Sequence, residues 1–248
     1  MREKNKTSLI SLILILVVLF SLNISIAQPE PPTILDSTSS RRNNTDVVSI
    51  DAIAGNVTAL SIHGMTSTQT WQGFYGNITG EIVLSNNANA VMYNWSLVVP
   101  RGKIYASTNT SINWAQGNIG CYNFSITDTD YLTITELENS FDIPTDAADS
   151  IQNTFNQFTH PTIYPASSTI PENTCHSTQL YQNEIPGTDF PELLLYADDS
   201  NSVIFTSIIP GSTTGFDGSL MDFQLLVPAN GRLGQTTPTT YYLYVELE

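Results

Sequence analysis

Positive charge is scarce in this chain of 248 residues. Eight Lys and Arg residues stand against 23 Asp and Glu, which gives a formal net charge of −15. No segment gathers the basic residues into a stripe that would neutralise phosphates. We therefore expect no nucleic-acid partner.

Cysteine, glycine and proline are also few, with 2, 14 and 13 residues. These counts exclude a disulfide-dense miniprotein, a collagen-like repeat and a low-complexity chain. Charged residues make up only 12% of the sequence, whereas 41% of the residues are hydrophobic. The composition is that of a folded protein whose polarity comes largely from uncharged side chains.

The common catalytic signatures are missing. The string nearest to a nucleophile elbow, residues 211–215, places its serine second instead of third. The three histidines, His63, His160 and His176, lie far apart and lack the H-E-x-x-H spacing of zinc enzymes. No phosphate-binding P-loop and no G-x-G-x-x-G string is present, so we expect no nucleotide cofactor.

The N-terminus carries a long apolar segment. Residues 9–27 follow Arg2, Lys4 and Lys6 and end in Ser-Ile-Ala, a small-residue pattern that suits signal peptidase. We interpret residues 1–27 as a secretory signal that is removed. The segment also approaches the roughly 20 residues that cross a bilayer as a helix, so a retained membrane anchor is the second interpretation and a pilin-type leader is a third.

Export follows from either of the first two interpretations, because basic residues before the apolar segment place the rest of the chain outside the cell. Without residues 1–27, 22 acids stand against 5 bases, a net charge of −17 (5 − 22). We predict an extracellular or cell-surface protein. Its membrane contact would be limited to residues 9–27, if these are retained.

The rest of the chain divides into a linker and a body. Residues 28–45 contain Pro29, Pro31 and Pro32, followed by a stretch without large apolar side chains. Such a segment buries little surface, so we predict a flexible linker. Residues 46–248 are predicted to form one extracellular domain.

The body shows the pattern of antiparallel strands. Short runs rich in Val, Ile, Thr, Tyr and Phe alternate with polar positions and are separated by Gly, Pro and Asn. This pattern predicts an all-β, β-sandwich-like domain. The predicted strands are residues 56–62, 70–75, 80–85, 91–99, 103–107, 121–126, 131–136, 193–196, 203–209, 221–227 and 240–247. In the last of these, Tyr241, Leu243, Val245 and Leu247 share one face.

One segment has helical periodicity instead. In residues 145–158, Thr145 suits the N-terminal cap, and the apolar residues that fall on one helical face are Ala147, Ala148, Ile151, Phe155 and Phe158. We predict one short helix there. The Pro-rich residues 160–191 that follow are predicted to form a long functional loop or covering flap.

The two cysteines are Cys121 and Cys175. An even count in an exported chain favours a disulfide. Closing a loop of about 55 residues would stabilise the fold by roughly 4 kcal/mol on the chain-entropy model. Two free thiols, or a metal pair with the neighbouring His176, remain as alternatives.

N-x-[ST] sequons occur only in the first half of the exported chain. Where the producing cell has an oligosaccharyltransferase, sequons at the surface would carry glycans, although chance matches are common in an Asn- and Thr-rich sequence. The six predicted glycosylation sites are Asn43, Asn56, Asn77, Asn94, Asn109 and Asn123.

Carboxylates are the most plentiful reactive groups. Glu136 and Glu138 would share one face of the predicted strand 131–136 and its continuation, which is compatible with a glycosidase pair or with solvated edge acids. Two turn-like clusters offer hard oxygen ligands that suit Ca²⁺, although Asp also favours turns for backbone reasons. The candidate metal ligands are Asp128, Asp130, Asp198 and Asp199.

Aromatic residues and their surroundings carry the most specific motifs. Trp71, Tyr75 and Trp95 are either core residues or an exposed aromatic patch that binds sugars. The strings W-Q-G-F-Y-G-N at 71–77, D-F-Q-L-L-V-P at 222–228 and Y-Y-L-Y-V-E-L at 241–247 resemble those of a group of uncharacterised exported proteins of archaeal type. The resemblance spans most of residues 50–248. It implies a surface location and an all-β body, and it carries over no functional site.

The predicted function is therefore structural or adhesive contact, without catalysis. Candidate partners are further copies of the chain, a surface glycan or an envelope protein, and strand 240–247 is a candidate for pairing between copies. The alternative is a secreted carbohydrate-active enzyme that uses a carboxylate pair. An enzyme of that kind needs a concave pocket with two acids about 5 to 10 Å apart, whereas an assembling protein needs a flat apolar patch or an unpaired strand edge.

Overall fold

The computed structural model describes residues 28–43, 48–115, 117–127, 131–166, 168–231 and 237–248. Strands take up 35% and helices 7% of the chain, all strand pairs are antiparallel, and the all-β prediction is confirmed. The predicted leader and the candidate ligands Asp128 and Asp130 lie outside the described residues. No helix within the described ranges is long and apolar enough to cross a membrane.

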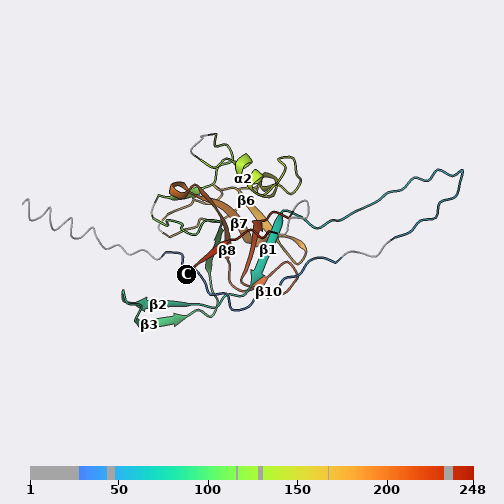
Figure 1. Cartoon of the computed structure of the whole chain (residues 1–248). Helices are drawn as coiled ribbons and strands as arrows, with labels where there is room; N and C mark the ends of the chain where they lie inside the picture. The colour runs from blue at the N-terminus through green and yellow to red at the C-terminus, as the bar shows by residue number, and fades with distance from the viewer. Residues whose placement is uncertain (1–27, 44–47, 116, 128–130, 167, 232–236) are drawn as a thin grey trace, which may run out of the picture.

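A six-stranded sheet, called the main sheet below, forms the centre of the body (Figure 1). Its spatial order is β12, β4, β8, β7 and β5, and β6 pairs with another part of the long strand β7. The strands are β4 (Gly102–Ser107), β5 (Ile119–Cys121), β6 (Ser177–Gln182), β7 (Ile185–Ala197), β8 (Ser202–Ile209) and β12 (Tyr242–Leu247). The last strand of the chain therefore lies at an edge of the main sheet.

Both faces of the main sheet are buried. In β8, Val203 and Phe205 belong to one hydrophobic cluster, whereas Ile204 between them belongs to the other. In β7, Leu194 and Leu195 divide in the same way. A strand covered on both sides reads as an unbroken apolar run, which explains why residues 193–196 are all apolar or aromatic.

A second sheet and two short helices cover the first face. The second sheet consists of two strands, and its residues Leu225 and Val227 join the cluster of Phe205. This packing of sheet on sheet is the predicted sandwich. The covering elements are β1 (Trp71–Gly76), β11 (Phe223–Pro228), α2 (Ile134–Ser140) and α3 (Ile151–Thr154).

Irregular segments cover the second face. The Trp114 ring packs against the rings of Tyr105 and Tyr244, with centroids 4.8 and 5.5 Å apart. Ile163 and Ile170 form a β-bridge and are buried in the same cluster. Buried apolar side chains of this kind hold long loops against a sheet, although the loops have no regular structure of their own.

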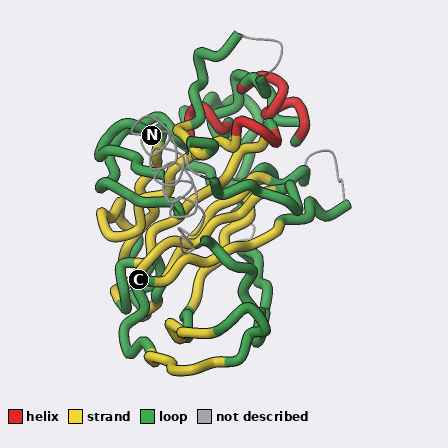
Figure 2. Tube along the Cα trace, turned by 90° about the vertical axis from the view of Figure 1, so that its left-hand side faces the viewer, coloured by secondary structure: helices red, strands yellow, loops and turns green. Residues whose placement is uncertain are grey.

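Two pieces of the chain project from the body. One is an antiparallel hairpin of β2 (Glu81–Ser85) and β3 (Val91–Ser96), and the other, called the excursion below, is residues 48–68, which contain no strand or helix. Figure 1 shows them on opposite sides of the body. Figure 2 shows the helices at the top of the body and strands at its lower end. The short strands β9 (Thr213–Thr214) and β10 (Leu220–Met221) complete the fold.

The strand predicted at residues 131–136 is wrong. Residues 134–140 form helix α2, which begins with a capping box: Glu136 N–H donates to the Thr133 hydroxyl, and the Glu136 carboxylate accepts from Thr133 N–H at 2.9 Å. The sequence T-I-T-E is also the signature of this cap. The strand interpretation followed the β-branched residues and missed the cap.

The predicted helix at 145–158 is too long. Helix α3 contains only residues 151–154, and its N-terminal cap is Ser150 instead of Thr145. The Ser150 hydroxyl accepts from Asn153 N–H at 3.2 Å. Turns at residues 144–150 replace the first two helical turns. Ile151 and Phe155 are nevertheless fully buried, as their helical spacing predicted, whereas Ala148 and Phe158 of the same predicted face are exposed.

Three further boundaries differ from prediction. Residues 56–62 form no strand, and β5 ends at Cys121 where the strand 121–126 was predicted to begin. The Pro-rich residues 160–191 contain β6 and the first half of β7, so they are only partly a loop. By contrast, the faces predicted for β12 are confirmed, because Leu243, Val245 and Leu247 pack on the first cluster and Tyr244 is buried in the second.

Candidate functional site

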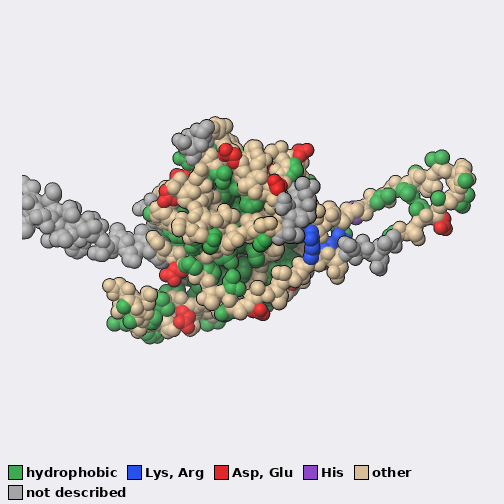
Figure 3. Space-filling view, viewed as in Figure 1, with side chains coloured by type: hydrophobic (Ala, Val, Ile, Leu, Met, Phe, Trp, Pro, Cys, Tyr) green, Lys and Arg blue, Asp and Glu red, His purple; other side chains and the backbone are tan. Residues whose placement is uncertain are grey.

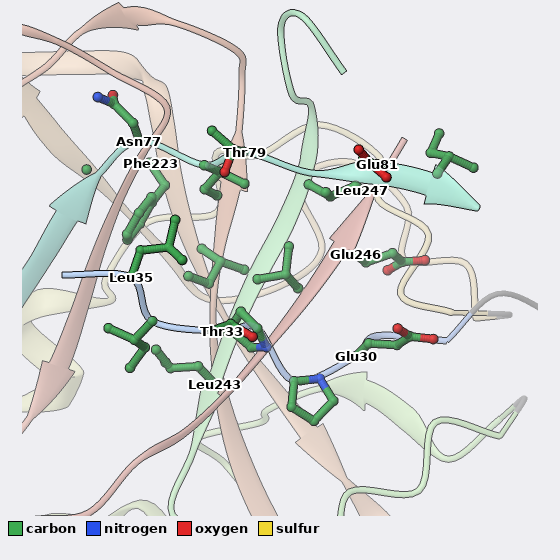
Figure 4. Close-up of a pocket in the computed structure, with 18 of the residues that line it drawn as sticks. Glu30, Thr33, Leu35, Asn77, Thr79, Glu81, Phe223, Leu243, Glu246 and Leu247 are labelled. Atoms are coloured by element: carbon green, nitrogen blue, oxygen red, sulfur yellow. The ribbon is translucent and has the colours of Figure 1, made fainter. Parts of the chain in front are cut away.

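A groove of about 760 Å³ lies between the N-terminal segment, the hairpin and the edge of the main sheet (Figure 4). Leu243, Val245 and Ile104 of the main sheet line it with their apolar side chains. Phe223 of β11 and Leu35 of the N-terminal segment line it as well. The groove therefore lies against the first hydrophobic cluster, which includes Ile104 and against which Leu243 and Val245 pack.

The N-terminal segment is attached to the sheet at one point. Glu30 N–H donates to Val245 O at 3.0 Å, and Val245 N–H donates to Glu30 O at 2.8 Å. Pro29 beside it is buried, whereas residues 30–43 are exposed. Glu30 thus pairs with the outer side of the edge strand β12, while the predicted flexibility of residues 28–45 stays a prediction.

The charged residues of the groove are all acids. Glu30, Asp36, Glu81 and Glu246 line it, and no Lys or Arg stands among the described residues that do so. An apolar surface with an acidic border attracts apolar or cationic groups and repels anions.

Glu246 is engaged in a buried cluster. Its Oε2 accepts the Tyr105 hydroxyl at 2.6 Å and lies 3.8 Å from Nζ of Lys103, which also forms an ion pair with Glu248. Burial and then the Glu246 charge raise the pKa of Tyr105 well above its usual value. Lys103 is the only lysine after residue 27 and is buried. The cluster ties β12 to β4, which is a structural role.

The hairpin presents an apolar face outside the body. The cross-strand pairs Ile82 with Trp95 and Leu84 with Tyr93 place four large side chains on one face. The rings of Tyr93 and Trp95 are in contact, with centroids 4.9 Å apart. Both rings are nevertheless at least half exposed, at 59% and 50%. No second layer covers this face within the part of the chain that the structure describes.

The opposite face of the hairpin is more polar. Glu81, Val83 and Asn94 share it, and Asn94 Nδ2 donates to Glu81 Oε2 at 2.7 Å. The hairpin therefore has one side that suits water and one that suits a protein partner.

One acid lies inside the sandwich. Glu192 of β7 is fully buried, one of its carboxylate oxygens accepts Leu226 N–H at 2.7 Å, and the other has no hydrogen-bond partner. Burial raises the pKa of Glu192 well above its usual value, although the Leu226 bond opposes the shift. Its position between the two sheets leaves it no route to a ligand, and it costs stability when ionised.

The predicted disulfide between Cys121 and Cys175 is present, with Cα atoms 4.9 Å apart. It ties strand β5 to the loop that precedes β6. His160 supports the same loop, because its Nε2 accepts the N–H groups of Thr174 and Cys175 at 3.0 and 2.9 Å. Burial lowers the pKa of His160, which keeps this acceptor nitrogen unprotonated.

The sequons lie mostly at the surface. Asn109 is the exception, because it is half-buried and its Nδ2 donates to Ser202 Oγ at 3.0 Å. Asn77 lines the groove, and Asn94 stands on the polar face of the hairpin. Glycosylation itself stays a prediction. The exposed sequons are Asn43, Asn56, Asn77, Asn94 and Asn123.

The candidate metal ligands that can be placed serve the fold. Asp198 and Asp199 begin a short 3-10 helix. The carboxylate of Asp199 accepts Nδ2 of Asn113 at 2.7 Å and Nδ2 of Asn118 at 2.9 Å, so both oxygens are already used. No group of three or more His, Cys, Asp or Glu suited to a metal occurs among the described residues.

The predicted carboxylate pair is not on a strand. Glu136 and Glu138 lie two residues apart on helix α2, where side chains point in nearly opposite directions. Glu136 belongs to the capping box, and Glu138 is fully buried and accepts Gln152 N–H at 3.1 Å. Glu138 therefore links α2 to α3, Glu136 caps α2, and neither acid lines the groove.

The three predicted aromatic residues have different surroundings. Trp71 packs against Phe155 with centroids 6.0 Å apart, and its Nε1 donates to Asp149 O at 2.8 Å. Tyr75 is exposed on β1, and Trp95 is exposed on the separate hairpin sheet. Trp71 is thus a core residue, as the structural interpretation had it, whereas Trp95 belongs to the apolar hairpin face.

Two notable residues escaped the sequence analysis. Glu30 lies among prolines and was read only as part of a linker, and no local signal reports its pairing with a strand more than 200 residues away. Glu192 had a visible signal, because it is an acid directly before the apolar run Leu193, Leu194 and Leu195.

A scan against protein-family models, a search of the curated proteins and a search of the solved structures each found no match to this chain.

Proposed function

We propose that this chain is an exported cell-surface protein that works through contacts, chiefly by associating with further copies of itself. The observation that carries this proposal is the apolar face of the β2–β3 hairpin, on which Tyr93 and Trp95 are at least half exposed. A two-stranded hairpin is marginally stable in water by itself, and large exposed apolar patches mark interaction sites.

Two further features support the proposal. The apolar segment 9–27 with its basic start is typical of exported proteins, and a disulfide persists in oxidising environments outside the cytosol. The resemblance to exported proteins of archaeal type supports the same location. Surface glycans and envelope proteins stay on the list of candidate partners.

Association is measured directly. Sedimentation velocity of the purified full chain over a hundredfold concentration range is expected to show growing species, and negative-stain microscopy to show regular assemblies. Monodisperse monomers at the highest concentration would contradict the proposal.

A carbohydrate-active enzyme is the second candidate, and the acids that line the groove are the observation that favours it. Glu30, Asp36 and Glu81 are the exposed acids among them, and Glu30 and Glu81 are the two glutamates of this set. The test is release of reducing ends from surface polysaccharides by the wild type and by the Glu30→Gln/Glu81→Gln variant. Hydrolysis by the wild type that the variant loses would favour the enzyme.

A further inference from the structure

We propose that residues 56–62 of one copy add as a strand to the free edge of β3 in the next copy, so that the chains join head to tail. The inference rests on the proposed function, because it names the elements through which copies associate. The partner is a second copy of this chain.

The donor is the second arm of the excursion, which has strand composition but no strand partner. The sequence predicts a strand over residues 56–62, yet the structure leaves them extended and unpaired, with Val57, Leu60 and Ile62 exposed. The full excursion contains a single acid, Asp51, and no Lys or Arg. Segments with β-branched residues and little charge pair readily with other strands.

The excursion does not pair with itself. A turn at residues 54–55, with Gly55 at a φ of 88° and a bond from Asn56 N–H to Ile53 O of 3.2 Å, reverses the chain at its tip. Beyond that turn no backbone hydrogen bond joins the two arms within the described residues. The backbone groups of residues 57–62 are therefore available to an outside strand.

The acceptor is β3 and not β2. β2 is the strand on the groove side of the hairpin, because Glu81, Ile82 and Val83 line the groove, whereas no residue of β3 lines it. Among the described residues, β3 forms backbone bonds only with β2. An added strand would also place its side chains beside the exposed face of Tyr93 and Trp95, which turns an isolated hairpin into a three-stranded sheet.

The positions of donor and acceptor determine the symmetry. The excursion and the hairpin project from opposite sides of the body (Figure 1). A contact between surfaces on opposite sides of the body is heterologous, because each copy uses its donor on one neighbour and its acceptor on another. Such a contact repeats from copy to copy, and the rotation between copies determines whether the series stays open or closes into a ring.

Charge supports the same pairing. Arg41 and Arg42 are exposed next to the root of the excursion, where Arg42 Nη1 donates to Met65 O at 3.3 Å, and basic side chains appear there in Figure 3. The hairpin side carries Glu81, and the acids Glu30 and Asp36 line the groove beside it. The side of the donor is thus basic and the side of the acceptor acidic, and this complementarity favours the approach of one copy to the next.

The test uses two variants of the full chain, kept in mild detergent so that residues 9–27 do not cause association. Leu60→Asp/Ile62→Asp removes the donor, and Tyr93→Asp/Trp95→Asp removes the acceptor. Each variant alone is expected to associate at least about tenfold more weakly than the wild type. Mixed together, they are expected to form a one-to-one pair and nothing larger, because each still has the element that the other lacks.

Matched controls separate this contact from others. Val48→Asp/Ile50→Asp places the same charges on the first arm, and Val98→Asp places one on an exposed loop after the hairpin. Both are expected to associate like the wild type. If the first-arm variant loses association and Leu60→Asp/Ile62→Asp does not, residues 56–62 are not the donor.

A covalent trap covers the case in which a charged variant perturbs the hairpin. Leu60→Cys in one chain and Trp95→Cys in another are expected to form a mixed disulfide on mild oxidation, whereas two chains with Leu60→Cys are not. A wild type that stays monomeric refutes the proposed function together with this inference. A wild type that associates while all four charged variants behave like it refutes the inference alone.

Discussion

The main sheet and the β2–β3 hairpin are both antiparallel and apolar, yet their side chains have opposite fates. Leu194 of β7 is fully buried, while Trp95 of β3 is half exposed. Both β7 and β3 contain large apolar and aromatic side chains. What differs is the layer above them, because β11 and the helices lie over the main sheet and no described element lies over the hairpin. An apolar strand is therefore a core strand only where the same chain supplies a cover.

The largest expected effect comes from the covered region. Phe205→Ala opens a cavity between β8 and the layer above it, and is expected to reduce the free energy of unfolding by about 3–5 kcal/mol. Chemical denaturation followed by tryptophan fluorescence measures this loss. A change below about 1 kcal/mol would mean that the sandwich core is not packed as described.

The disulfide is expected to contribute slightly less. Cys121→Ala/Cys175→Ala removes the link between β5 and the loop before β6, and the expected loss is about 2–4 kcal/mol. Denaturation of this variant is compared with that of the reduced wild type, which serves as the control. If reduction leaves the denaturation midpoint unchanged, the bond does not constrain the unfolded chain as expected.

Glu192→Gln tests the acid inside the sandwich. Because the pKa of Glu192 is raised, the folded chain favours its neutral form, so its stability contribution is full below the ordinary glutamate pKa and is lost as pH rises through the raised value. Gln stays neutral and keeps an acceptor for Leu226 N–H. The melting temperature of the variant relative to the wild type is therefore expected to rise from pH 4 to pH 9. A difference that is constant with pH would show that Glu192 is not ionised in this way.

The smallest effect on folding is expected from the hairpin. Trp95→Ser is expected to change the free energy of unfolding by less than about 0.5 kcal/mol, because its ring is half exposed and packs on Tyr93 of the same hairpin. The same variant is expected to weaken association in sedimentation experiments. A large loss of stability in the monomer would show that the hairpin belongs to the folding unit of the main sheet.

Much of the fold could be predicted from local patterns. Alternation in β12 gave the correct faces for Leu243 and Tyr244, and the two cysteines gave the correct bond. The errors arose where two local signals competed. At residues 131–136, β-branched residues suggested a strand, but the Thr133 cap determined a helix.

The candidate site was much less predictable. The groove depends on Glu30 meeting Val245, a contact between residues at opposite ends of the chain, and no local spacing encodes such a contact. The sequence predicted the two strands of the hairpin. It could not predict that the hairpin stands apart from the main sheet, because the exposure of a strand depends on which other segments of the chain cover it. The same limit of prediction applies to residues 56–62. Their composition indicates a strand, but it does not reveal whether the neighbouring strand comes from the same chain or from another copy.

The bridge between Glu30 and Val245 has a mechanical consequence. If the body is tethered through residue 28, tension along the tether reaches the edge strand β12 first, at two backbone hydrogen bonds. These two bonds join a single pair of residues, whereas neighbouring strands of the main sheet are joined along their length. The two bonds would therefore break before the strands of the main sheet separate. Once open, residues 28–43 and the excursion would extend by up to about 3.3–3.6 Å per residue. The chain thus carries a reserve of length that lets a loaded copy yield without unfolding its core.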